Sequence, residues 1–214
     1  MKTVNFFSLY IFLVLGVATV IFNSCGKDDE HPKDPLTYDV GVLINGVKWA
    51  ARNVDKQGTF AAKPEDVGMF YQWNRKIAWT PTGDVTGWDT SVPDGDTWEK
   101  SNDPSPAGWR VPTIKDIQKL CNDSIVSQTW ITVNGINGMK FTDIATGNSI
   151  FLPATGGRYS YDGTLSQYVG AVGDYWSCTA ADTNGAYALG FARLDVDWTY
   201  TPRGGGLSVR PVAE

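Results

Sequence analysis

Two carboxylates near the C-terminus have the residue types and spacing that acid–base chemistry requires. Asp195 and Asp197 stand on either side of Val196, so in a β-strand both carboxylates lie on one face. A carboxylate pair of this kind suits the hydrolysis of a glycosidic bond. It also suits a solvated strand face, or one wall of a binding site. Nothing else in the sequence is typical of a glycosidase, so we expect no catalytic residue and a protein that is not an enzyme.

Aromatic residues around this pair form the strongest candidate for a binding surface. Rings with a few hydrogen-bonding neighbours are typical of surfaces that recognise sugars or proteins. The candidate ligand-binding residues are Tyr159, Tyr161, Asp195, Asp197, Trp198, Tyr200 and Arg203. The alternative, that about half of the rings are simply buried in the core, stays open at this point.

Cysteine and histidine chemistry is largely excluded. The chain has three cysteines and a single histidine, His31, which lies in a polar segment near the N-terminus. A Ser-His-Asp or Cys-His mechanism therefore has no histidine in the folded part. Cys121 and Cys178 could form a disulfide in an exported protein, or both could be buried free thiols. The sequence favours the free thiols.

Calcium is the one cofactor that the sequence leaves open. Asp94-Gly95-Asp96, with Asp103 nearby, offers several carboxylate oxygens. The spacing is not that of an EF-hand, and an Asp-Gly turn explains the same residues. We therefore expect no metal site, with calcium as the less favoured alternative.

Composition and charge narrow the classes of partner. The 214 residues carry 18 Lys+Arg against 23 Asp+Glu, which gives a net charge of −5, and 42% of them are hydrophobic. This balance is that of a globular protein. It disfavours nucleic acids and anionic membrane surfaces, because phosphate recognition needs clustered basic residues.

The N-terminus is typical of an export signal. Lys2 precedes an apolar run over residues 6–22, which is at the lower limit of about 17–25 residues for a membrane-spanning helix. We interpret residues 1–24 as a lipoprotein signal peptide, Cys25 as the acylated residue, and residues 25–37 as a flexible acidic tether. Acyl chains on Cys25 would anchor the protein to a membrane. A transmembrane anchor is the alternative.

We interpret residues 38–214 as one domain, mainly β with little helix. Asn45-Gly46 and Asn134-Gly135 each stand between alternating apolar residues, which predicts hairpins with type I′ turns. Thr113 and Asp116 have the spacing of a capping box, which predicts one helix. Further strands are expected at residues 175–179, 186–191, 196–200 and 207–212.

Several blocks of this domain resemble the FISUMP domain, the major paralogous domain of surface proteins in Bacteroidota. The blocks are INGVKWA (44–50), RNV (52–54), GMFYQW (68–73), NDP (102–104), PAGWRVPT (106–113), YWS (175–177) and LSVRPV (207–212). They follow one another in the family's order over residues 40–213. Ser105 departs from the family pattern, because many relatives carry Cys there. Any disulfide inferred from those relatives is therefore in doubt.

The resemblance implies an α+β, mainly β domain with a C-type-lectin-like fold. Such a fold has two small antiparallel sheets, one or two helices, long structured loops, and first and last strands that pair. The resemblance also implies a lipoprotein of the outer membrane, anchored through Cys25 and facing the cell exterior.

Together with the aromatic candidates, the resemblance predicts a non-catalytic, adhesin-like module. Its partner would be a glycan or a surface protein of another cell, with membrane contact only through the lipid and no contact with nucleic acid. Two alternatives stay open: a structural component of a cell-envelope or fimbria-like assembly and, more remotely, a polysaccharide-processing enzyme.

Overall fold

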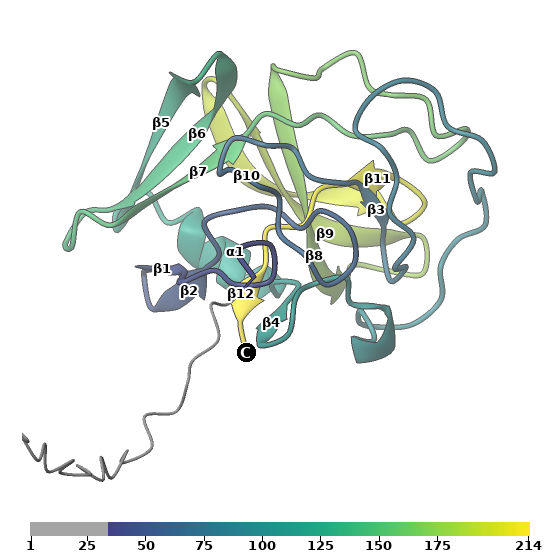
Figure 1. Cartoon of the computed structure of the whole chain (residues 1–214), viewed down its shortest axis with the longest axis horizontal. Coiled ribbons are helices and arrows are strands. Elements are labelled where there is room, and N and C mark those ends of the chain that lie inside the picture. Colours follow the sequence, from purple (N-terminus) through teal and green to yellow (C-terminus); the bar gives the residue numbers. More distant parts are fainter. Residues whose placement is uncertain (1–33) are drawn as a thin grey trace, which may run out of the picture. The chain divides into compact units, whose positions relative to one another are not determined.

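Short antiparallel strands make up most of the regular structure in residues 34–214, the part of the chain that the computed structural model describes (Figure 1). The strands are β1 (Val42–Ile44), β2 (Val47–Trp49), β3 (Tyr71–Gln72), β4 (Trp109–Arg110), β5 (Val126–Val133), β6 (Ile136–Asp143), β7 (Ser149–Pro153), β8 (Val172–Ala180), β9 (Gly185–Ala192), β10 (Asp195–Pro202), β11 (Gly206–Leu207) and β12 (Val212–Ala213). The helices are α1 (Ile114–Leu120) and a short 3-10 helix, η1 (Lys100–Asn102). The expected signal peptide and Cys25 lie outside the described residues.

The strands form four small sheets rather than the expected two. Their orders are β1-β2-β12-β4, β5-β6-β7, β10-β9-β8 and β11-β3. The mainly β, α+β class predicted from the sequence is confirmed. Within residues 34–214 no helix is long and apolar enough to cross a membrane.

Both predicted Asn-Gly hairpins are confirmed. Asn45 and Gly46 have φ angles of 44° and 74°, and they join β1 to β2. Asn134 and Gly135 have φ angles of 49° and 85°, and they join β5 to β6. Positive φ at both central residues is the requirement of a type I′ turn, which asparagine and glycine meet at the least cost.

The two ends of the domain meet in one sheet. Val212 of β12 pairs with Trp49 of β2 on one side and with Arg110 of β4 on the other. The expected pairing of the first and last strands is therefore wrong in detail, because β2 lies between β1 and β12. The two ends of the domain still come together in this sheet.

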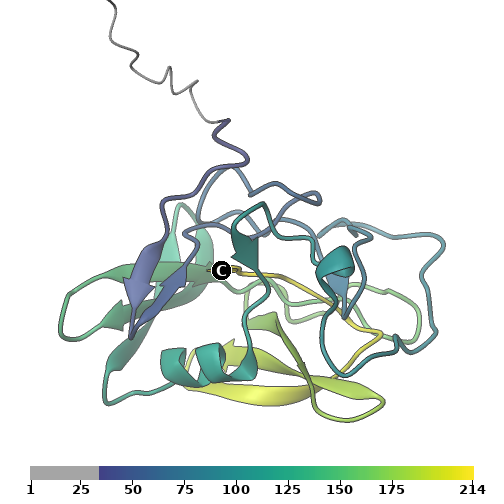
Figure 2. The same ribbon diagram turned by 90° about the horizontal axis from the view of Figure 1, so that it is seen from below.

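Helix α1 packs on the sheet formed by β8, β9 and β10, and the two views of the ribbon agree on this (Figures 1 and 2). Thr113 accepts a hydrogen bond from Asp116 N, and the Asp116 carboxylate accepts one from Thr113 N, so the predicted capping box is present. Ile117 and Leu120 are fully buried in the same core cluster as Phe141 and Phe191.

Three buried arginines hold the long loops in place. Arg158 and Arg203 are 3% exposed and Arg210 is fully buried. Arg158 donates to carbonyl oxygens of residues 80–83, and Arg203 donates to those of residues 93 and 95. None of the three forms an ion pair with a carboxylate of residues 34–214. Main-chain carbonyls instead satisfy most of their donors, which a buried guanidinium requires.

Candidate binding site

The candidate residues of β10 lie on one strand but on two different faces. β10 is the edge strand of its sheet and pairs with β9 in an unbroken register from Asp195 to Pro202. Because side chains alternate along a strand, Asp195 and Asp197 share one face while Trp198 and Tyr200 share the other. The rings and the carboxylates of β10 therefore lie on opposite faces of the strand and do not form the single surface that we had expected.

The two rings of β10 are partly exposed. Trp198 is 41% exposed and packs edge-on against Tyr187, with ring centroids 5.4 Å apart. Tyr200 is 52% exposed, and its hydroxyl donates to Asp182 Oδ1 at 3.3 Å. The Tyr200 ring lies over Gly185, where a Cβ would stand 2.1 Å from it. These rings are available to a flat partner.

Arg203, one of the candidate ligand-binding residues, is buried and holds neighbouring loops in place. It is 3% exposed, and its guanidinium stacks on the Trp73 ring at 4.3 Å. Its nitrogens donate to the carbonyl oxygens of Pro93 (3.0 Å), Gly95 (2.7 Å), Gly185 (3.3 Å) and Asp182. Four of its five N–H donors are used in this way, and the side chain is buried, so Arg203 has little to offer a ligand.

Tyr159 and Tyr161 form a stacked pair on a tight loop. Their ring centroids are 5.3 Å apart and the planes differ by 13°. The loop turns back through Gly163, whose N–H donates to Tyr159 O at 3.0 Å. Gly163 has a φ of 77°, and a Cβ there would lie 2.6 Å from the Trp88 ring. Only glycine fits this position, so the turn that presents the two rings is well defined.

A cavity of about 230 Å³ opens beside Tyr159, and we call it the tyrosine cavity. Its polar and aromatic lining includes Tyr159, Ser160, Ser166, Tyr168, Asp174 and Thr201. These residues come from the loop after β7, from β8 and from the end of β10. The cavity places Tyr159 beside Thr201 and Pro202 at the C-terminal end of β10. Trp198 and Tyr200, which the sequence analysis grouped with Tyr159, do not line this cavity.

Asp174 is the residue of this cavity that our sequence reasoning missed. Burial raises the pKa of its carboxyl group to about 6, and no neighbouring charge contributes. No hydrogen bond or ion pair reaches this carboxylate from any residue between 34 and 214. The available signal was its place in β8, where an acid stands directly before the buried Tyr175 and Trp176. Ionisable groups with such perturbed pKa values collect at functional sites.

Arg158 also lines the tyrosine cavity, but its guanidinium faces elsewhere. Nε and Nη2 donate to Thr80 O at 2.9 and 2.8 Å, and Nη1 donates to Gly163 O at 2.7 Å. Burial lowers the pKa of Arg158, and Asp84 is the carboxylate that partly offsets this effect. The positive charge is therefore directed at the 80–84 loop and does not neutralise Asp174.

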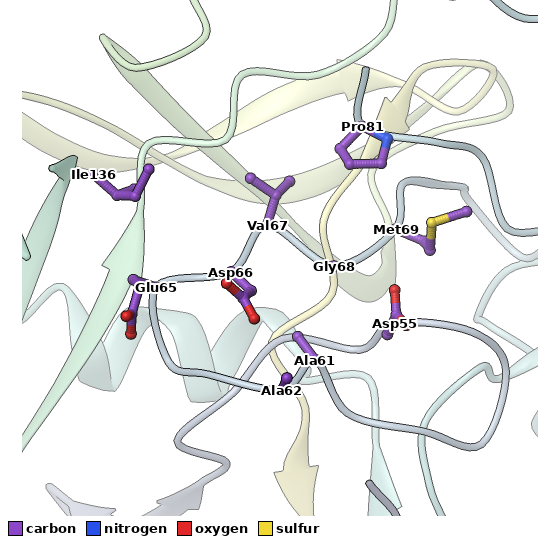
Figure 3. A pocket seen from close by; sticks show the side chains of 10 residues that line it. All are labelled: Asp55, Ala61, Ala62, Glu65, Asp66, Val67, Gly68, Met69, Pro81 and Ile136. Carbon is purple, nitrogen blue, oxygen red and sulfur yellow. The ribbon is translucent and has the colours of Figure 1, made fainter. Parts of the chain in front are cut away.

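A second cavity, of about 440 Å³, lies between the loop around residue 66 and the β5–β6 turn (Figure 3). Ile136, Val67 and Pro81 line one side, and the carboxylates of Glu65 and Asp66 line the other. Both acids already have partners, because Glu65 accepts from Asn134 Nδ2 at 2.7 Å and Asp66 from Lys63 N at 3.0 Å. The Asn134 contact also lowers the pKa of Glu65. These carboxylates shape loops, so this cavity is the weaker candidate.

The calcium alternative finds no support in the described residues. Asp103 uses both carboxylate oxygens inside the fold, accepting from Ser105 N at 2.8 Å and from Val111 N at 3.0 Å. Asp94 accepts a hydrogen bond at its carbonyl oxygen from Asn74. Between residues 34 and 214 no group of three or more acidic, cysteine or histidine side chains could hold a metal ion.

Cys121 and Cys178 are both free thiols, so the disulfide considered from the sequence is not formed. The physical reason is their location. Cys121 ends α1 and packs against the core cluster that contains Phe141, whereas Cys178 packs against the cluster that contains Trp73. Burial raises the pKa of Cys121 to about 12 and also raises that of Cys178. Neither thiol is activated as a nucleophile.

Compared with known proteins, the chain matches no family model, no curated protein and no solved structure.

Proposed function

We propose that this protein is a surface-exposed lipoprotein whose domain binds a glycan or a partner protein without altering it chemically. The observation that carries the proposal is the tyrosine cavity. It combines aromatic walls, several hydroxyl groups and a carboxylate that no other residue uses. Cavities with a few polar groups among aromatic side chains are typical binding sites.

We propose further that the domain is of the FISUMP type with a C-type-lectin-like fold. Two features support this fold. The last strand joins a sheet with strands from the start of the domain, and long ordered loops are held by buried tryptophan and arginine side chains. The lipid anchor at Cys25 and the location on the outer membrane rest on the sequence pattern alone.

Binding of the full chain to an array of glycans and surface proteins tests this proposal. Three proteins are compared: the wild type, Tyr159→Ala for the tyrosine cavity, and Trp198→Ala/Tyr200→Ala for the exposed rings. We expect a ligand whose binding Tyr159→Ala weakens at least tenfold. A folded protein that binds nothing and self-associates would instead favour a structural component of the cell envelope.

A further inference from the structure

The Asp174 carboxylate stands in the tyrosine cavity without a compensating group. It lies near the start of β8, where it pairs in register with Gly190 of β9. Gly190 has no side chain to cover it, and a Cβ there would lie 3.6 Å from Asp174 Oδ1. Removing a carboxylate from water without a hydrogen bond or a counter-charge is unfavourable. Asp174 is only partly buried, so water or a ligand can supply the donor that no protein group provides at this position.

A positively charged group meets this requirement better than a neutral one. A hydroxyl group of a ligand could donate to Asp174, but it leaves the negative charge in place. A protonated amine supplies both donors and charge, and the attraction is strong where water is partly excluded. Tyr159 and Tyr168 also line the cavity, and a cation is favoured close to an aromatic ring.

The remaining walls of the cavity point to a sugar that carries the amine. Ser160, Ser166 and Thr201 provide hydroxyl groups that can accept or donate hydrogen bonds. Ser166 Oγ already accepts a hydrogen bond from Tyr168 N at 3.2 Å. A lysine side chain would use the carboxylate and the rings but would make no use of the Ser160 and Thr201 hydroxyl groups. A volume of about 230 Å³ lies below the range of about 300–1,000 Å³ that is usual for larger ligands. One sugar ring is a suitable occupant.

We propose that the tyrosine cavity binds one hexosamine unit whose amino group is free and protonated, with Asp174 holding the ammonium group and Tyr159 and Tyr168 lining the ring. This inference rests on the proposed function, and it names the ligand class for that site. It assigns Asp174 as the residue that decides between a free amino sugar and its N-acetylated form, because acetylation removes the positive charge.

The test compares D-glucosamine with N-acetyl-D-glucosamine by calorimetric titration into the full chain in detergent. These two sugars differ at one nitrogen, which carries a positive charge in the first and an uncharged, larger acetyl group in the second; the Asp174→Asn variant separates the effect of charge from that of size. We expect D-glucosamine to bind at least tenfold more tightly at pH 7.5, and Asp174→Asn to remove this preference. The matched control is Asp123→Asn, which makes the same change of charge at an exposed position after α1. It is expected to leave the preference within twofold of wild type.

Each of the other outcomes overturns the inference. Equal binding of the two sugars, or a preference that survives Asp174→Asn, excludes the role of Asp174. Binding of a lysine-containing peptide as tightly as D-glucosamine excludes the sugar class. If neither sugar binds but the array identifies another ligand, the inference fails while the proposed function stands. Thermal unfolding of Asp174→Asn, together with Tyr168→Ala as a second cavity variant, separates loss of binding from loss of folding.

Discussion

Arg210 donates a hydrogen bond from Nε to Asn53 Oδ1 at 2.8 Å, although 157 positions separate the two residues. Both side chains are fully buried. Asn53 in turn donates from Nδ2 to Val67 O at 2.9 Å, and Arg210 donates from Nη2 to Phe151 O at 3.1 Å. This one pair therefore connects the start of the domain, a loop, strand β7 and the C-terminal segment.

The first prediction concerns this pair. Asn53→Ala should lower the free energy of unfolding by about 2–3 kcal/mol, because a buried charged donor loses its acceptor. Arg210→Lys should have a similar effect, since lysine cannot reach the same set of acceptors. Because the two residues share one network, the double variant should lose about 1–2 kcal/mol less than the two single losses added together. Urea unfolding of the four proteins measures this, and strict additivity would contradict the network.

The second prediction separates the structural role of Arg203 from ligand binding. Arg203→Lys should lower the free energy of unfolding by about 2–4 kcal/mol, because several buried carbonyl oxygens lose their donor. Ligand affinity of the folded protein should stay the same. The matched control is Arg193→Lys at an exposed position, for which we expect a change within about 0.5 kcal/mol. A stable Arg203→Lys protein that no longer binds ligand would instead support the expected ligand-binding role of Arg203.

The third prediction follows from the pKa of Asp174, which burial raises from 3.8 to about 6. Between these two pH values the folded state binds more protons than the unfolded state, so stability falls as the pH rises. Above pH 6 the charged carboxylate therefore costs at most about 3 kcal/mol. Asp174→Asn should be more stable than wild type at pH 7.5 and similar to it at pH 3.5.

Denaturant unfolding of both proteins at the two pH values measures this difference. Wild type and Asp174→Asn must be compared directly, because other acidic residues make the folded protein more stable as the pH rises. Hydrogen bonds from Asn45 and Thr146 lower the pKa of Asp143, and those from Asn184 and Gly185 lower that of Asp182. Their contributions are lost at low pH in both proteins and cancel in the difference. A difference independent of pH would mean that Asp174 ionises as it does in water.

The fourth prediction concerns the close contact between β8 and β9 at Gly173. A Cβ at Gly173 would lie 2.1 Å from Cζ of Phe191, whose ring is 3% exposed and packs among other aromatic rings. Gly173→Ala should therefore destabilise the protein by about 1–3 kcal/mol through overpacking. Gly204→Ala is the control, because its Cβ meets nothing closer than 3.4 Å. Equal melting temperatures for the two variants would argue against this packing.

The fifth prediction concerns the two free thiols. Cys121 and Cys178 should resist a thiol reagent in the folded protein and react once it is unfolded, because burial keeps both thiols protonated. A reducing agent should leave the melting temperature unchanged. Mass spectrometry after alkylation under denaturing conditions checks this directly. If neither thiol is alkylated and the protein is two hydrogens lighter than its reduced form, the two cysteines form a disulfide. A melting temperature that falls on reduction would support the same conclusion.

Local patterns predicted local structure well. The Asn-Gly turns and the Thr113 capping box depend on residues within four positions of one another, and the structure confirms them. Features that depend on distant contacts were harder. The sequence placed Arg203 beside the exposed rings of β10, but its partners at residues 93 and 95 lie more than 100 positions away. These partners are main-chain carbonyl oxygens, which every residue has. Residue types therefore give no sign of which distant segment Arg203 contacts.

The candidate site shows the same division. The sequence identified Tyr159 and Tyr161 as ligand-binding candidates, and the structure places Tyr159 in the wall of a cavity. It missed Asp174, because an acid inside a strand is usually on an exposed face. Only the fold, which brings the loop after β7 and the end of β10 beside β8, shows that this carboxylate lines a partly closed cavity.

The three buried arginines hold the loops mainly through main-chain carbonyl oxygens, which every amino acid possesses. The shape of the 80–83 and 93–95 segments is thus specified by a side chain elsewhere in the protein and largely not by their own side chains. Exchanging outward-facing residues in these segments leaves these arginine hydrogen bonds in place. Such an arrangement permits a lineage to change what its surface presents while inheriting the same framework.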